Sequence, residues 1–297
     1  MARLTKDLHL ARYRIDCPKE FRLKDIDPGD TGKIQSKEGV AKQLEEGVQT
    51  ICELQERLYA QAEWSLLLVF QAMDTAGKDA TIKHVLSGVN PQGCRVTSFK
   101  VPSHEELAHD FLWRASKAMP ERGHIGVLNR SYYEEVLVVR VHPEYLENQH
   151  LPGKLVTKRI WRDRYTSIND FERHLTRNGT VVLKFFLHLS PEEQRRRILD
   201  RIDEKDKNWK FNKDDLVERK LWDRYMNAFE EMVRATSTDS APWHVVPADH
   251  KWFTRLVVSS LIIEKLRSLD LHFPKLNAGQ KKEMIKARAE LAGDKSN

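Results

Sequence analysis

Cysteine is scarce in this sequence, and long hydrophobic runs are absent. Its three cysteines, Cys17, Cys52 and Cys94, are widely spaced and form no CxxC pair, which argues against a disulfide framework and against a zinc site. The N-terminal segment is too polar for a signal peptide, and no apolar run approaches the length of a membrane span. We therefore expect a cytoplasmic protein with no membrane partner.

The most informative segment is FQAMDTAGKDATI at residues 70–82, where an apolar run meets a turn of small residues. The run at residues 64–70 is typical of a buried parallel strand, and an amphipathic helical pattern resumes directly after Lys78. A strand, loop and helix in this order form phosphate-binding loops, in which backbone N–H groups and the helix N-terminus face phosphate oxygens and the lysine reaches them. The pattern indicates phosphoryl chemistry.

The match of this segment to the motif G-x-x-x-x-G-K-[ST] is imperfect. Ala72 stands at the position of the first glycine, and Asp79 stands where a magnesium-binding hydroxyl belongs. A small-residue turn in an ordinary α/β protein therefore stays open as an alternative. Asp74 favours the functional interpretation, because a carboxylate beside phosphates is useful when it holds Mg²⁺ or positions an acceptor group.

Apolar segments that are typical of strands alternate with helical ones along the chain. This alternation predicts a doubly wound, mostly parallel sheet flanked by helices, within a single α/β domain over residues 1–297. Residues 1–35 are interpreted as a polar arm lying over the core, and residues 275–297 as a charged tail. Strands are predicted at 64–70, 93–101, 124–131, 180–189 and 242–248, and helices at 37–61, after Lys78, within 102–120, at 192–210 and at 252–266.

Polar side chains follow the predicted strand at 124–131, in the segment NRSYYEEV. Asn129, Arg130 and Glu134 would lie at the carboxyl edge of the sheet, where proteins with a phosphate-binding loop keep a second metal-handling segment. The guanidinium of Arg130 is suited to bidentate contact with an acceptor phosphate. A strand end that is simply capped by polar residues explains the same pattern.

The predicted helix at 192–210 is strongly basic. Arg197 and Arg201 lie one turn apart on the same face, and further basic residues continue the charge as far as Lys210. A solvated face with salt bridges is the simple explanation. Because the helix follows a phosphate-binding sheet, we favour a lid over residues 190–222 that closes over phosphates and excludes water.

The chain is mildly basic, with 50 Lys and Arg against 44 Asp and Glu, and its basic residues occur in clusters. Clustered positive charge indicates a polyanionic partner. The clusters flank the phosphate-binding loop and do not line an aromatic-rich sheet or a recognition helix, so we expect phosphates and not nucleic acid.

Several blocks of the sequence, in the same order, resemble the polyphosphate kinase 2 family. The resemblance covers roughly residues 37–266 and is carried by AMDTAGKDATIKHVLSGVNPQG, FKVPS, VLNRSYYEEVLV, EEQRRR, NWKFNKDDLVER and TDSAPWHVVPADHKWFTRL. It implies a thymidylate kinase-like fold, a phosphate-binding-loop sheet with a helical lid. It also implies Mg²⁺-dependent phosphate transfer between inorganic polyphosphate and the nucleotides AMP, ADP and ATP, with Mn²⁺ as a substitute metal.

Carried over by position, the resemblance assigns roles to individual residues. Asp74, Lys78, Arg130 and Glu134 would be catalytic, with Asp74 and Glu134 as metal ligands. Asn129 stands where the family more usually has an aspartate, and its pairing with Glu134 is similar to the subgroup that accepts both AMP and ADP. Polyphosphate would bind Ala76, Gly77, Lys78, Asp79, Arg197, Arg201 and Lys210, and the nucleotide would bind Asn129, Arg130, Lys100 and Ser103.

Other functions stay open from the residues alone. An ATP-dependent nucleotide or nucleoside kinase would use the same loop, and a non-catalytic polyanion binder would explain the departures at Ala72 and Asp79. The retention of Asp74, Lys78 and Glu134 counts against a binder that has lost activity. Basic grooves that follow long chains are often built across subunits, so we expect a homo-oligomer, a dimer or a tetramer.

Overall fold

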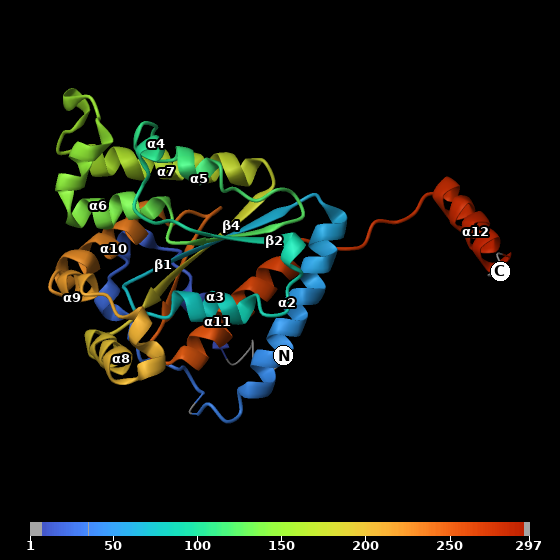
Figure 1. Cartoon of the computed structure of the whole chain (residues 1–297), viewed down its shortest axis with the longest axis horizontal. Coiled ribbons are helices and arrows are strands. Elements are labelled where there is room, and N and C mark those ends of the chain that lie inside the picture. Colours follow the sequence, from blue (N-terminus) through green and yellow to red (C-terminus); the bar gives the residue numbers. More distant parts are fainter. Residues whose placement is uncertain (1–7, 35, 294–297) are drawn as a thin grey trace.

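The computed structural model describes residues 8–34 and 36–293, and the strands of this part form one parallel sheet (Figure 1). The strand order is β2-β3-β1-β4-β5, and every neighbouring pair runs parallel. This arrangement confirms the predicted α/β fold with its parallel sheet. The strands are β1 (Ser65–Ala72), β2 (Cys94–Ser98), β3 (Ile125–Asn129), β4 (Thr180–His188) and β5 (Trp243–Pro247).

Helices cover both faces of the sheet (Figure 1). On one face α2 (Ala41–Gln61), α3 (Lys78–Val85) and α11 (Lys251–Arg267) contact one another; α3 contacts β1 and β3, and α11 contacts β4 and β5. On the other face α7 (Ile160–Arg177) packs on β4, and α10 (Trp222–Thr236) packs on α7. The sheet is therefore buried on both sides, as the continuous apolar runs of its strands require.

Shorter elements complete the described part of the chain. The remaining α-helices are α4 (His104–Leu107), α5 (Trp113–Ser116), α6 (Val138–Val141), α8 (Pro191–Asp203), α9 (Asp214–Arg219) and α12 (Ala278–Gly293). The 3₁₀-helices are η1 (Leu10–Tyr13), η2 (Pro18–Glu20), η3 (Leu23–Asp25), η4 (Pro91–Gly93), η5 (Tyr132–Val136), η6 (Pro143–Gln149), η7 (Gly153–Leu155) and η8 (Lys205–Lys210).

The buried side chains of β1 point alternately to the two faces of the sheet, as in any strand. Leu66, Leu68 and Phe70 of β1 pack with the cluster under α2 and α11, whereas Leu67 and Val69 pack with the cluster under α7 and α10. Because β1 lies at the centre of the sheet order, the loop that follows it lies at the middle of the carboxyl edge.

Two predicted helices are shorter in the structure than expected. The segment within 102–120 forms α4 and α5 instead of one helix, although Ser103 and Glu106 do make the expected capping box. The helix expected at 192–210 ends at Asp203, and a 3₁₀-helix covers the rest.

The predicted N-terminal arm falls partly outside the described residues. In its described part, η1 contacts β5, the last strand of the sheet order, and η2 contacts α10. Among the residues that the structure describes, no helix is both long and apolar enough to cross a membrane.

Candidate active site

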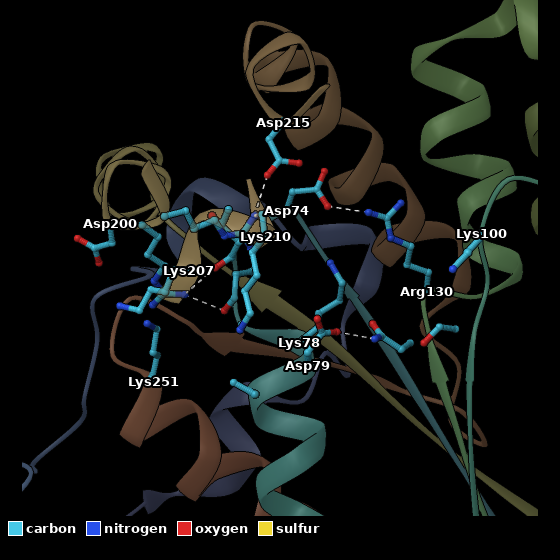
Figure 2. A pocket seen from close by; sticks show the side chains of 18 of the residues that line it. Asp74, Lys78, Asp79, Lys100, Arg130, Asp200, Lys207, Lys210, Asp215 and Lys251 are labelled. Atoms are coloured by element: carbon cyan, nitrogen blue, oxygen red, sulfur yellow. Dashed lines mark hydrogen bonds and ion pairs between the residues drawn. The ribbon is translucent and has the colours of Figure 1, made fainter. Parts of the chain in front are cut away.

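A cavity of about 610 Å³ opens at the carboxyl edge of the sheet (Figure 2). It lies between the loop after β1, the end of β3 and the region of α8 and η8, and it is strongly basic. The residues that line it are Asp74, Thr75, Ala76, Gly77, Lys78, Asp79, Ala80, Ser98, Phe99, Lys100, Val101, Asn129, Arg130, Arg197, Asp200, Arg201, Lys207, Lys210, Asp215 and Lys251.

The loop after β1 has the backbone of a phosphate-binding turn. Gly77 (φ 98°) and Thr75 (φ 68°) both adopt the left-handed region, and α3 begins at the next residue after Gly77. The N-terminus of α3 therefore points its free N–H groups and its positive dipole end toward this edge. The loop thus has the conformation that the sequence predicts for anion binding.

Lys78 is buried in this loop, with 8% of its surface exposed. Its Nζ donates to the carbonyl oxygens of Ala72 at 2.9 Å and of Met73 at 3.4 Å. Burial lowers the pKa of Lys78, and the nearby carboxylate of Asp74 opposes that shift. Lys78 thus lines the cavity with its ammonium held by two carbonyl oxygens of the loop.

Asp74 and Arg130 form an ion pair across the cavity, with a distance of 2.7 Å between Oδ1 and Nη2 (Figure 2). Arg130 directly follows β3 and adopts a left-handed backbone (φ 63°). Burial disfavours its charge, but the carboxylates of Glu134 and Asp74 outweigh that effect and raise the pKa of Arg130. The structure therefore brings together the carboxylate and the guanidinium that the sequence placed on separate strands.

Glu134 lies in η5, four residues after Arg130. Burial raises the pKa of Glu134, while Arg130 and Lys78 lower it and Asp74 raises it further. Within the described part of the chain, no group of three or more His, Cys, Asp or Glu side chains is placed to hold a metal ion by itself. A metal at this site would need other ligands besides Asp74 and Glu134.

Asn129 connects β3 to the loop helix. Its Nδ2 donates to Oδ1 of Asp79 at 2.6 Å. Asp79 occupies the position where the common motif has a Ser or Thr hydroxyl, and Asn129 the position where the family more usually has an aspartate. The carboxylate is therefore on the loop helix and the neutral polar group is on β3, the reverse of the usual arrangement. Asp79, which departs from the common motif, is thus in direct contact with Asn129, which departs from the more usual residue of the family.

The residues of α8 play different structural roles. Arg201 donates through Nη1 to the carboxylate of Asp215 at 2.9 Å and to the carbonyl of Lys210 at 3.1 Å, which ties α8 to η8 and α9. Arg197 is 4% exposed, and its guanidinium contacts backbone carbonyls of the loop. Both were expected to bind polyphosphate; Arg201 is partly exposed, whereas the hydrogen-bonding groups of Arg197 are already occupied.

Two lysines of this cavity were not among the predicted site residues, although Lys207 belongs to the segment that was predicted to be a basic lid. Lys207 of η8 and Lys251 of α11 add positive charge on the side opposite Arg130 and Lys100 (Figure 2). Burial and the neighbouring cations Arg197, Arg196 and Lys207 lower the pKa of Lys251. The signal for Lys251 was its place directly after the last strand, since the carboxyl ends of parallel strands meet at one edge.

A second cavity of about 300 Å³ adjoins the first and is mostly apolar. The two cavities share Phe99, Lys100, Val101 and Arg130, so they meet at the loop after β2 and at the start of η5. Ser103, which was expected to bind nucleotide, lines neither cavity; its hydroxyl caps α4. The other residues of the second cavity are Pro102, Leu107, Arg114, Glu134, Glu135, Val138, Val139, Tyr145, Asn148 and Gln149.

Comparison with known proteins gives a consistent result. The chain is 50% identical over 282 residues to an ADP-polyphosphate phosphotransferase of Rhodopseudomonas palustris, and the matched region covers 92% of this chain and 98% of that protein. It is 43% identical over 277 residues to an AMP/ADP-polyphosphate phosphotransferase of Meiothermus ruber, with 93% of this chain and 100% of that protein covered.

Structural comparison agrees with the sequence comparison. The crystal structure of polyphosphate kinase 2 from Arthrobacter aurescens TC1 superposes with a TM-score of 0.84 at 38% identity, covering 93% of this chain and 95% of that one. The sequence pattern that defines polyphosphate kinase 2 matches residues 34–274. The chain therefore belongs to the polyphosphate kinase 2 family.

Proposed function

We propose that this protein transfers a phosphoryl group from inorganic polyphosphate to AMP or ADP, forming ADP or ATP. The observation that carries the proposal is the junction of two unlike cavities at Arg130: a large basic one built on the phosphate-binding loop and a smaller apolar one beside it. The names of the Rhodopseudomonas and Meiothermus relatives support the same reaction.

The two cavities suit the two substrates. The apolar cavity accepts a nucleoside, whose phosphate would reach Arg130 and Lys100 at the junction. The basic cavity accepts the polyphosphate chain, with its terminal phosphate at Lys78 and the N-terminus of α3 and the following phosphates at Lys207, Lys210 and Lys251. The donor and the acceptor would thus approach each other from opposite sides of the Asp74–Arg130 pair.

The chemistry is an in-line displacement at the terminal phosphorus atom of the chain. An oxygen of the acceptor phosphate forms a bond to this phosphorus, and the bond to the bridging oxygen breaks, leaving a chain shorter by one phosphate. The protein contributes positioning and positive charge, and Arg130 and Lys78 flank the transferred group. Because the leaving and attacking groups are both phosphates, the reaction is reversible.

Mg²⁺, or Mn²⁺ in its place, fits the donor atoms of this site. Mg²⁺ is commonly held by one or two carboxylates together with substrate phosphates and water, so Asp74 and Glu134 suffice as protein ligands without a third carboxylate. When bound, the metal would neutralise phosphate charge. Arg130, whose guanidinium lies beside Asp74, would hold the acceptor phosphate.

The test is nucleotide analysis after purified protein is mixed with Mg²⁺, long-chain polyphosphate and either AMP or ADP, without ATP. We expect ADP and ATP to appear from AMP, and ATP to appear from ADP. ATP from ADP alone would restrict the acceptor to diphosphates. No product from polyphosphate, with ATP then acting as donor to AMP or a nucleoside, would refute the proposal and favour an ordinary nucleotide kinase.

A further inference from the structure

The base of α8 carries two buried polar side chains that point at the phosphate-binding loop. Gln194 is 1% exposed and Arg197 is 4% exposed, although both belong to the basic helix that was expected to form a mobile lid. The neighbouring Arg195 and Arg196 are exposed. Burial of a long polar side chain is costly unless its polar atoms are paired, so the partners of these two residues are informative.

Arg197 makes a hydrogen bond through each of its guanidinium nitrogens. Nη1 donates to the carbonyl oxygens of Thr75 at 3.1 Å and Ala76 at 2.9 Å, and Nη2 donates to those of Ala248 at 2.6 Å and Asp249 at 3.0 Å. Nε donates to the carboxylate of Glu193 at 2.7 Å. The guanidinium thus joins the loop after β1 to the segment after β5.

Gln194 extends the same contact by one residue along the loop. Its Nε2 donates to the carbonyl oxygen of Asp74 at 3.2 Å, and its Oε1 accepts from Nη1 of Arg219 in α9 at 2.8 Å. Arg219 also donates to the carbonyl of Pro191 at 2.7 Å, the first residue of α8. The amide of Gln194 is therefore oriented from one side by α9 and holds the loop from the other.

These contacts fix three consecutive carbonyl groups of the loop, at Asp74, Thr75 and Ala76. A carbonyl oxygen that turned into the cavity would oppose a bound phosphate, because both carry negative charge. Contacts from α8 keep these oxygens away from the anion and partly neutralise them, and they brace the left-handed residues Thr75 and Gly77.

We propose that Gln194 and Arg197 are positioning residues that hold the phosphate-binding loop in its anion-binding conformation, and that the base of α8 is a fixed brace and not part of a moving lid. The proposal rests on the proposed function, since the loop is taken to bind the transferred phosphate. In this arrangement, polyphosphate is contacted by the cations beyond the brace, at Arg201, Lys207 and Lys210.

The kinetic test separates positioning from direct binding of polyphosphate. Arg197→Lys keeps the positive charge but loses the forked donor geometry, and Gln194→Leu removes both amide contacts at similar volume. We expect each variant to lower kcat at least 10-fold, with little change in KM for long-chain polyphosphate and in the slope of log KM against log salt. Arg195→Lys is the matched control on the exposed face of the same helix and should behave as wild type.

Direct binding by Arg197 gives the opposite pattern. Arg197→Lys would then raise KM for polyphosphate and reduce the salt slope while kcat stayed near the wild-type value, because a contact with a polyanion is screened by salt. That result would overturn the proposal for Arg197. An unchanged kcat in Gln194→Leu would overturn it for Gln194.

A second measurement does not depend on the identity of the substrates. In amide hydrogen exchange of the free protein, a peptide covering residues 66–85 should exchange faster in both variants than in wild type, with unchanged exchange in β4 and α11. No acceleration in a folded variant refutes the brace even if the wild type proves inactive with polyphosphate. A wild-type protein that is inactive with polyphosphate refutes only the proposed function. If one of the two variants does not fold, the exchange of the other variant tests the brace.

Discussion

At the scale of single residues, the site depends on Asp74 and Lys78. Asp74→Asn removes a carboxylate that pairs with Arg130, and Lys78→Ala removes an ammonium from the lining of the cavity. Removing one such electrostatic contact in a preorganised site lowers turnover by about 10²–10³-fold. We therefore expect each variant to lose at least about 100-fold in kcat with polyphosphate and ADP.

The control for this prediction is Lys83→Ala, which removes an exposed lysine from the same helix as Lys78. It should keep the wild-type kcat, and the thermal midpoints of all three variants should stay close to that of the wild type. Near-normal turnover of a folded Asp74→Asn or Lys78→Ala protein would show that the reacting phosphate binds elsewhere.

Glu134 should set the acid side of the pH profile. Burial raises the pKa of Glu134, so the carboxylate takes up its proton at a higher pH than an ordinary glutamate. If the ionised form is needed to hold a metal, kcat falls as the pH drops through this raised pKa and is constant above it. A pH profile of kcat measures the pH at which kcat falls to half its plateau value. In Glu134→Gln this fall should disappear, and kcat should be lower than in the wild type at neutral pH. An acid limb that persists in Glu134→Gln would belong to another group.

Part of the site could be predicted from the sequence because it follows from topology. Asp74 follows β1, and Arg130 follows Asn129, the last residue of β3. Because β1 and β3 are neighbouring parallel strands, the residues that follow them lie close together at the carboxyl edge of the sheet. The pairing of Asn129 with Asp79 and the partners of Arg197 could not be predicted. They depend on how α3 and α8 approach the loop, which no local sequence pattern specifies.

At the scale of elements, a buried ionic network supports the segment that carries Arg130. Lys184 in the middle of β4 is fully buried, and its Nζ donates to Glu172 Oε2 at 2.6 Å, to the Tyr133 hydroxyl at 2.9 Å and to the Thr236 carbonyl at 2.7 Å. The hydroxyls of Tyr132 and Tyr133 both donate to Glu172 at 2.8 Å. The network therefore joins β4, α7 and α10 to η5.

Breaking one side of this network should be costly. Lys184→Met leaves the carboxylate of Glu172 buried without its cation, and we expect the free energy of unfolding to fall by about 3–5 kcal/mol in urea denaturation. The double variant Lys184→Met, Glu172→Gln removes both charges, keeps an acceptor oxygen for the two tyrosine hydroxyls and should recover part of the loss. Arg173→Ala, which breaks an exposed pair with Asp170 on the same helix as Glu172, should cost at most about 1 kcal/mol. Equal losses for the buried and exposed pairs would contradict this account.

The elements that sequence patterns placed well are those with long, uniform periodicity. β1 and β4 are mostly apolar and almost wholly buried, and their bounds were predicted within two residues, whereas the region of α4 and α5 was not. Two local capping signals compete there: Ser103 caps α4, and Asp110 accepts from the N–H of Leu112 at 2.9 Å and starts a new turn. The sequence shows both signals but not which one ends the first helix.

At the scale of the whole molecule, the C-terminal segment stands apart from the body. In Figure 1 helix α12 lies well away from the sheet and its covering helices, and every described residue of this helix is exposed. The last residue that packs on the core is Leu271, 9% exposed, which joins the cluster under α2 and α11. The family match also ends close to this point, at residue 274.

Removal of residues 275–297 should therefore leave both the fold and the reaction unchanged. The described residues of this segment are all exposed, and a segment that buries little apolar surface contributes little to the free energy of unfolding, so the difference should stay within about 0.5 kcal/mol. None of the residues lining the two cavities lies in this segment, so kcat and KM for polyphosphate and ADP should match those of the full chain. Urea denaturation and steady-state kinetics of the truncated and full-length proteins check this prediction.

A longer truncation provides the matched control for this result. Ending the chain after residue 265 removes Leu266, which is fully buried at the end of α11, together with Leu271. Loss of two buried leucines should lower the free energy of unfolding by several kcal/mol, at about 2–5 kcal/mol for each. If removal of residues 275–297 also destabilised the protein, α12 would have to contact folded protein. Light scattering of the full-length and truncated proteins would then show whether that contact is with a second copy. Only in that case would the mass of the full-length protein exceed that of the truncated protein by whole subunits.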